Sequence, residues 1–275
     1  MQLLPKKAEY VYDNEETLTE EAVWENDIKK HFANAKQNVR SIWIYGFMEI
    51  FNNAIEHSGG NKITVIVNED EMFTSIAVID NGIGIFKNIK NTFKLNDEKD
   101  ALLELSKGKR TTDIKRHSGQ GIFFSSKFYD TFIIKSNNII YNGNIEEDYQ
   151  FITEISNYST YVFMRLANNS NRKAKDVIDE YSTESPGDFD KTIVPVILAE
   201  SNDLVSRSQA RRLLSGLELF KEVTLDFKDI EYIGQAFADE IFRVFPNMNT
   251  DTMIQEINTN TDVQNMINRA RNLKL

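Results

Sequence analysis

The chain has 275 residues, 41% of them hydrophobic, and a net charge of −10. This length suits about two domains, each with its own core, and neither part on either side of Pro186 is basic, which argues against a large nucleic-acid surface. The absence of Cys excludes disulfides, thiol catalysis and thiolate zinc sites, and no apolar run approaches the ~18 residues that span a bilayer. We therefore expect a cytoplasmic protein.

Periodicity divides the chain into two parts. Residues 1–19 are polar with little periodicity and are expected to form an N-terminal arm. Up to residue 167 the patterns predict, in order, helices over 20–36 and 41–57, a hairpin of strands over 62–67 and 73–79, a short helix over 100–105, a helix over 121–128, and strands over 131–135, 149–155 and 161–166. The polar stretch 85–118 is long for a compact domain, and such connections are often lids over active sites.

The second part follows a run of turn-forming residues at 168–187, which is expected to be a linker. After the linker, the patterns predict three strands that are each followed by a helix. The strands are expected over 192–199, 223–227 and 252–257, and the helices over 207–220, 235–245 and 262–272. Three strand–helix units imply a small α/β layer fold.

Three short segments of the first part carry polar side chains at informative spacing. In the helix predicted over 41–57, Glu49 and Asn53 are one turn apart, so the carboxylate and the amide share a face. An ordinary amphipathic helix with a solvated face would give the same pattern, so this pair does not define a site by itself.

Two glycine segments follow. Residues 80–84, Asp-Asn-Gly-Ile-Gly, place a carboxylate at the end of an apolar strand and before a turn. Residues 119–121, Gly-Gln-Gly, open a helix whose backbone N–H groups can cradle phosphate. Each segment alone is typical of an ordinary turn. Together with the helical pair, in this order, they predict a nucleotide pocket with a general base, a metal ligand, a base-reading carboxylate and a phosphate cradle.

The order and spacing of the three segments resemble the GHKL ATPase superfamily, which includes gyrase B subunits, mismatch-repair ATPases, histidine kinases and anti-sigma-factor serine kinases. The resemblance covers residues 20–167. It implies an α+β fold, in which this domain is a two-layer α/β sandwich of the Bergerat type that binds ATP and Mg²⁺ and uses 85–118 as its lid. Many histidine kinases lack a carboxylate at the position of Glu49, so its presence favours the hydrolases and serine kinases.

The resemblance assigns a role to residues of each segment. Glu49 would be the general base that activates the attacking nucleophile, and Asn53 would bind Mg²⁺. Asp80 would accept a hydrogen bond from the adenine amine, which guanine cannot supply, and Thr160 would support this contact. The ATP site implied in this way consists of Asn53, Asp80, Gly82, Gly84, Gly119, Gln120, Gly121, Thr160 and Lys109.

Cations are frequent in the expected lid, at Lys107, Lys109, Arg110, Lys115 and Arg116. A charge run of this kind is often only a solvated loop. In a lid beside a triphosphate, one or two of these side chains should pair with phosphate oxygens, and Lys109 is included in the expected ATP site for this reason.

The second part resembles STAS domains, the fold of anti-sigma-factor antagonists, through the segments 204–214 and 223–241. The resemblance is closer to a STAS-like domain of unknown function that is often fused behind a GHKL domain. In antagonists, the loop before the second helix carries a phosphorylatable serine. Here Gly234, Gln235 and Ala236 occupy the aligned positions and cannot accept phosphate, which puts the usual phospho-switch in doubt.

The expected layout is an arm over 1–19, a GHKL domain over 20–167, a linker over 168–187 and a STAS-like domain over 188–275. The expected function is an ATP-dependent conformational switch, a slow ATPase that signals to a protein partner through its STAS-like domain. A serine/threonine protein kinase of the anti-sigma-factor type and a non-catalytic nucleotide-sensing module remain as alternatives. No nucleic acid or membrane is expected as a partner, and a homodimer is compatible with the sequence.

Overall fold

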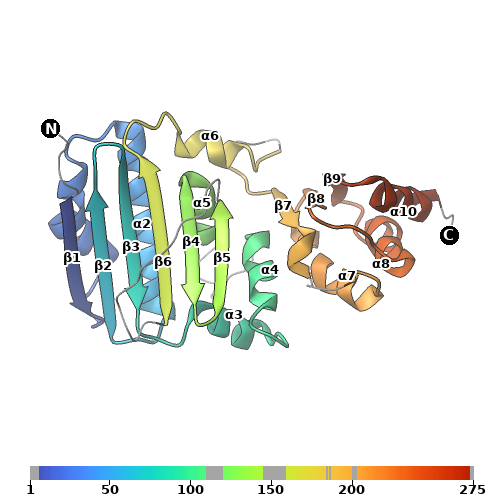
Figure 1. Ribbon diagram of the computed structural model, residues 1–275, viewed down its shortest axis with the longest axis horizontal. Coiled ribbons are helices and arrows are strands. Elements are labelled where there is room, and N and C mark those ends of the chain that lie inside the picture. The colour runs from blue at the N-terminus through green and yellow to red at the C-terminus, as the bar shows by residue number, and fades with distance from the viewer. Residues whose placement is uncertain are drawn as a thin grey trace. The chain divides into compact units, whose positions relative to one another are not determined.

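The computed structural model describes residues 6–109, 120–144, 159–183, 185, 187–199 and 203–272. The chain forms two compact units, each with its own sheet (Figure 1). The first unit contains residues 1–99 and 121–177, and the second contains residues 100–120 and 178–275. Among the helices of the described residues, none is both long enough and apolar enough to cross a membrane.

The first unit is built on a six-stranded antiparallel sheet with the strand order β1-β2-β3-β6-β4-β5. Its strands are β1 (Lys6–Asp13), β2 (Lys62–Glu69), β3 (Phe73–Asp80), β4 (Thr131–Ser136), β5 (Ile139–Asn144) and β6 (Thr160–Ala167). Its helices are α1 (Glu20–Val23), η1 (Trp24–Ile28), η2 (Lys29–Phe32), α2 (Gln37–His57), α3 (Ile85–Phe93), α5 (Gly121–Phe128) and α6 (Ala174–Asp179), the last of which runs into the second unit. The strand predicted over 149–155 lies outside the described residues.

The first strand corrects the expectation of an N-terminal arm over 1–19. Lys6–Asp13 pairs along its whole length with β2. Tyr10 and Tyr12 alternate onto one face of the strand, where the Tyr12 hydroxyl donates to Asp27 Oδ2 at 3.0 Å and the Tyr10 hydroxyl lies 2.8 Å from His31 Nε2. These contacts fix β1 to the helical segment that follows it. The apolar alternation of β1 is short and flanked by charged residues, so it was not predicted as a strand.

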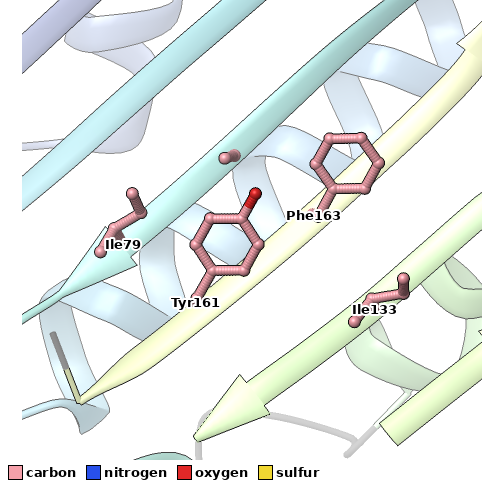
Figure 2. Close-up of a cluster of buried hydrophobic side chains, with 5 residues drawn as sticks. Ile79, Ile133, Tyr161 and Phe163 are labelled. Carbon is pink, nitrogen blue, oxygen red and sulfur yellow. The ribbon is translucent and has the colours of Figure 1, made fainter. Parts of the chain in front are cut away.

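Both faces of the central strands are buried. One face packs against α2, which runs behind the sheet in Figure 1, and it is lined by fully buried side chains of β2 such as Ile63, Val65 and Val67. The opposite face carries a second apolar cluster, drawn in Figure 2, of Ala77, Ile79, Ile133, Tyr161 and Phe163. Burial on both faces explains why β3 and β6 are almost continuously apolar in sequence.

The second unit is a parallel sheet in the order β7-β8-β9, with each strand followed by helix, as the alternation predicts. Its strands are β7 (Lys191–Pro195), β8 (Glu222–Asp226) and β9 (Met253–Ile257). Its helices are η3 (Val196–Ala199), α7 (Arg207–Leu214), η4 (Leu217–Leu219), α8 (Gln235–Asp239), η5 (Glu240–Val244), α9 (Phe245–Met248) and α10 (Thr261–Asn272).

One further helix of the second unit comes from an unexpected place in the sequence. Helix α4 (Asp100–Lys107) falls inside the segment 85–118 that was expected to be a lid of the first domain. In the structure it groups with the second unit and packs against β7 and η3. The chain therefore leaves the first unit after Lys99 and rejoins it at Gly121.

Candidate functional site

Two of the predicted site residues meet where α2 packs on α5. A Cβ atom placed on Gly121 would lie 2.0 Å from Oε2 of Glu49 and 2.7 Å from its Cδ. A side chain at this position would have to displace the Glu49 carboxylate, which therefore lies directly against the first residue of α5. The structure thus brings the predicted general base to the start of the helix that was predicted to cradle phosphate.

The start of α5 is a place where negative charge is stabilised. The first N–H groups of a helix have no partner within it, and the helix dipole is positive there. One turn before Glu49 on α2 lies Tyr45, whose pKa is raised by burial and further by the charge of Glu49. Tyr45 is therefore a neutral phenol at physiological pH. It was not among the predicted site residues, although its i−4 spacing from Glu49 is visible in the sequence.

Asn53 lies one turn after Glu49 on the same helix and is half-buried. Among the described residues, its side chain makes no hydrogen bond. The amide oxygen of Asn53 is therefore available to a ligand on the face of α2 that carries Glu49. In the described part of the chain, no three His, Asp or Glu side chains gather in a way that could hold a metal ion.

Asp80 is the last residue of β3, and only 6% of it is exposed. It stands directly opposite Thr160 of β6 in the antiparallel register, and the Thr160 hydroxyl donates to it. The Gly82 N–H donates to Oδ1 of Asp80 at 2.9 Å. Burial raises the pKa of Asp80, while the hydrogen bonds from Gly82 and Thr160 oppose that shift. The predicted pair of Asp80 and Thr160 is thus adjacent.

The glycines of the segment 80–84 are required by the fold itself. A Cβ atom on Gly82 would lie 2.0 Å from the carbonyl oxygen of Ser58, which follows α2, and the N–H of Ile83 donates to the same oxygen at 2.8 Å. Gly84 has a φ of +90°, which favours glycine, and it precedes α3. The turn is therefore held against the end of α2, with or without a ligand.

The remaining predicted residues are not gathered in the same way. Gly119 lies outside the described residues, as do Arg110, Lys115 and Arg116, and Gln120 is half-buried just before α5. Lys109 belongs to the second unit, where its ammonium donates to the carbonyl oxygen of Leu219 at 2.7 Å and lies 4.5 Å from the ring centre of Phe220. Burial lowers the pKa of Lys109.

Comparison with known proteins identifies part of the second unit. A family model described as a STAS-like domain of unknown function (DUF4325) matches residues 209–265, which run from α7 into α10. No curated protein matches the chain. The matched residues include none of the predicted ATP-site residues. The C-terminal part of the chain thus contains a STAS-like domain, within a protein that combines an antiparallel sheet and helices with this smaller α/β unit.

The loop before α8 in the STAS-like domain is closely packed. A Cβ atom on Gly234 would lie 2.7 Å from Cα of Val205, and the Gly234 N–H donates to the carbonyl oxygen of Leu204 at 2.8 Å. A serine cannot replace Gly234 without a backbone shift. The position therefore has a structural reason to be glycine, besides lacking a hydroxyl group.

Proposed function

We propose that the first unit binds Mg-ATP in the manner of the GHKL superfamily, and that the chain is an ATP-dependent conformational switch with slow ATPase activity. The observation that carries this proposal is the contact of the Glu49 carboxylate with Gly121 at the start of α5. Two segments far apart in sequence meet there, and they are the segments to which the resemblance assigns the general base and the phosphate cradle.

The pair of Asp80 and Thr160 supports the adenine assignment. Asp80 is a buried carboxylate that receives hydrogen bonds from a backbone N–H and a hydroxyl group. A carboxylate is an acceptor only, so it would select the exocyclic amine of adenine over the carbonyl group that guanine carries at the same position. ATP rather than GTP is therefore the proposed ligand.

Asn53 fits the proposed Mg²⁺ because its half-buried amide makes no hydrogen bond among the described residues. Mg²⁺ takes few protein oxygens, fills its other positions with phosphates and water, and neutralises phosphate charge when bound. Glu49, one turn away, would accept the proton of the attacking nucleophile. A protein partner would then bind the STAS-like domain differently depending on whether the first unit holds ATP.

The test begins with calorimetry of the full chain with ATP and with GTP, each in the presence and absence of Mg²⁺. The proposal expects Mg²⁺-dependent binding of ATP and much weaker binding of GTP. Reaction with γ-labelled ATP then separates the chemistry, because release of free phosphate indicates an ATPase. Label on a protein indicates the kinase alternative, and binding without turnover indicates the sensing module. No binding of ATP at all would contradict the proposal.

A further inference from the structure

Two neighbouring carboxylates of the second unit are buried where α7 packs against α8 and η5. They belong to Asp239, the last residue of α8, and Glu240, the first residue of η5. Their side chains are 8% and 7% exposed. Buried carboxylates need cationic partners, and three arginines surround this pair: Arg207, Arg211 and Arg243.

Two of the arginines satisfy the carboxylates by hydrogen bonds. Nε of Arg243 donates to Oδ1 of Asp239, and its Nη2 donates to Oδ2 at 2.7 Å, so the two side chains form a bidentate pair. Arg211 binds Glu240 through a single hydrogen bond, from Nε to Oε1 at 2.6 Å. The side chain of Arg211 is 68% exposed, and its Nη groups have no partner among the described residues.

The third arginine, Arg207, makes no hydrogen bond in the part of the chain that the structure describes. Its Nη2 lies 3.7 Å from Oδ2 of Asp239 and its Nε lies 4.0 Å from Oε2 of Glu240, beyond hydrogen-bond distance. The side chain is 59% exposed. Since three guanidinium groups surround two carboxylates, the cluster keeps a surplus of positive charge, and all N–H donors of Arg207 remain available.

The available donors of Arg207 and Arg211 lie close together. The two residues are one turn apart on α7, so they share a face, and both approach the same buried carboxylate, Glu240. A phosphate monoester has three terminal oxygens and up to two negative charges, so it can accept from both guanidinium groups at once. A carboxylate has only two oxygens, and the fork of one arginine uses both.

The surroundings of this arginine pair suit a protein ligand. Small molecules bind in concave sites that bury most of their surface, whereas both side chains here are more than half exposed on a helix. Val205, two residues before Arg207, is 45% exposed and offers an apolar contact beside the charges. The net charge of −10 disfavours nucleic acids and anionic membranes as ligands.

We propose that Arg207 and Arg211 form a recognition site for a phosphorylated serine or threonine of a protein partner. This inference rests on the proposed function only in that the STAS-like domain binds a protein, and it does not require ATP in the first unit. The phosphate oxygens would accept from the guanidinium group of Arg207 and from the Nη groups of Arg211. Asp239 and Glu240 hold the arginines in place from the buried side.

The arginine Nε–H signals in NMR spectra of the full chain, assigned by substitution, test this site. The probe is a library of short peptides with one phosphoserine and randomised neighbours, compared with the same library carrying serine. The phosphoserine library should shift the signals of Arg207 and Arg211, and the serine library should not. Arg207→Gln should weaken binding at least about tenfold, the lower end of what the loss of charge-assisted hydrogen bonds implies.

A matched control comes from α10 of the same unit. Arg269 is exposed and has no partner among the described residues, so Arg269→Gln removes the same charge and should bind the phosphoserine library as the wild type does. Arg207→Lys keeps the charge but lacks the planar fork, and it should lose part of the affinity. Because Arg207 makes no hydrogen bond within the described chain, both of its variants should unfold as the wild type does.

The outcomes separate this inference from the ATP proposal. The inference is overturned if neither arginine signal shifts, if the serine library binds equally well, or if Arg269→Gln weakens binding as much as Arg207→Gln. Inorganic phosphate that binds as tightly as the library, or binding to phosphatidic acid vesicles that depends on Arg207, would also overturn the assignment to a protein. Calorimetry with Mg-ATP is independent of these results: ATP binding without phosphoserine binding removes the inference alone, and the reverse removes the ATP proposal alone.

Discussion

The two units differ in the partners that they provide for a buried charged side chain. In the second unit, the Lys107 ammonium has a carboxylate and two carbonyl oxygens as partners, all supplied by the protein. In the first unit, Asp80 receives hydrogen bonds only from neutral groups, and no cation pairs with it among the described residues. A fold tolerates a buried charge that has a full set of partners, and removal of one partner alone is strongly destabilising. A buried carboxylate without a cation is a feature that an active or binding site can use.

Removal of the Lys107 charge should have the largest effect on stability. Lys107→Met removes one member of the buried ion pair with Glu104, which is 4% exposed, and the loss of one member of such a pair lowers the free energy of unfolding by about 3–5 kcal/mol. Both tryptophans, Trp24 and Trp43, lie in the first unit, so their fluorescence should change little. Hydrogen exchange of β8 should report the loss in the second unit.

The double variant Glu104→Met/Lys107→Met is the control for this prediction. Replacement of both charges by apolar side chains is often neutral or stabilising, so the double variant should regain most of the lost stability. If Lys107→Met alone leaves the exchange of β8 unchanged, the buried ammonium does not hold α4 and α7 together, and the contrast with Asp80 loses its basis.

Glu49→Gln should have the next largest effect, and it should act on catalysis rather than on folding. Glutamine keeps the shape of the side chain against Gly121 but cannot accept the proton of the nucleophile. General-base contributions are about 10²–10⁴-fold, so turnover should fall by that factor while ATP affinity is retained. Phosphate release and calorimetry measure the two quantities. The exposed Glu21 offers a control, since Glu21→Gln should change neither; equal turnover in Glu49→Gln and wild type would contradict the assignment.

The sequence predicted the local features of both regions. Alternation and β-branched runs located β2, β3 and β6, and the position of Asp80 at the end of β3 followed from them. The shared face of Glu49 and Asn53 followed from helical periodicity. These elements of the first unit could be predicted one by one, because every signal used lies within one helix or one strand.

The sequence could not predict the partners of these elements. Ala101, Leu103 and Leu105 of α4 are buried in the structure, but the sequence contains no information about which sheet covers them. Helix α4 was therefore expected to belong to the first domain, and in the structure it groups with the second unit. Lys109 was expected to pair with phosphate, and in the structure its ammonium donates to the carbonyl oxygen of Leu219. Strand β1 was missed for a related reason, since its pairing with β2 is a long-range contact.

Asp80→Asn should change ATP binding and stability in opposite directions. The adenine amine would lose a charged acceptor worth roughly 1.5–3 kcal/mol, which is about a 10- to 150-fold loss of affinity. The amide oxygen of asparagine can still accept from the Gly82 N–H, and the buried charge is gone, so the first unit should become more stable at neutral pH. Calorimetry and tryptophan-monitored unfolding test the two effects, with the exposed Asp13→Asn as the control.

The smallest expected effect is the pH dependence of the stability that Asp80→Asn adds to the first unit. Burial raises the pKa of Asp80 above its ordinary value of 3.8. Between 3.8 and the raised pKa, the folded state holds a proton that the unfolded state has lost, so the free energy of unfolding falls as the pH rises, and the loss persists at neutral pH. Below 3.8 the carboxyl group is neutral in both states.

The difference in stability between Asp80→Asn and the wild type should therefore be largest at neutral pH and shrink toward zero as the pH falls below 3.8. Asp239 in the second unit should have the opposite pH dependence. The hydrogen bond from Arg243 lowers the pKa of Asp239, so the ionised carboxylate stabilises the second unit at neutral pH, and this stabilisation is lost in acid. Tryptophan fluorescence across this pH range follows the first unit alone. If the difference in stability between Asp80→Asn and the wild type stays constant with pH, burial of the Asp80 charge does not destabilise the first unit.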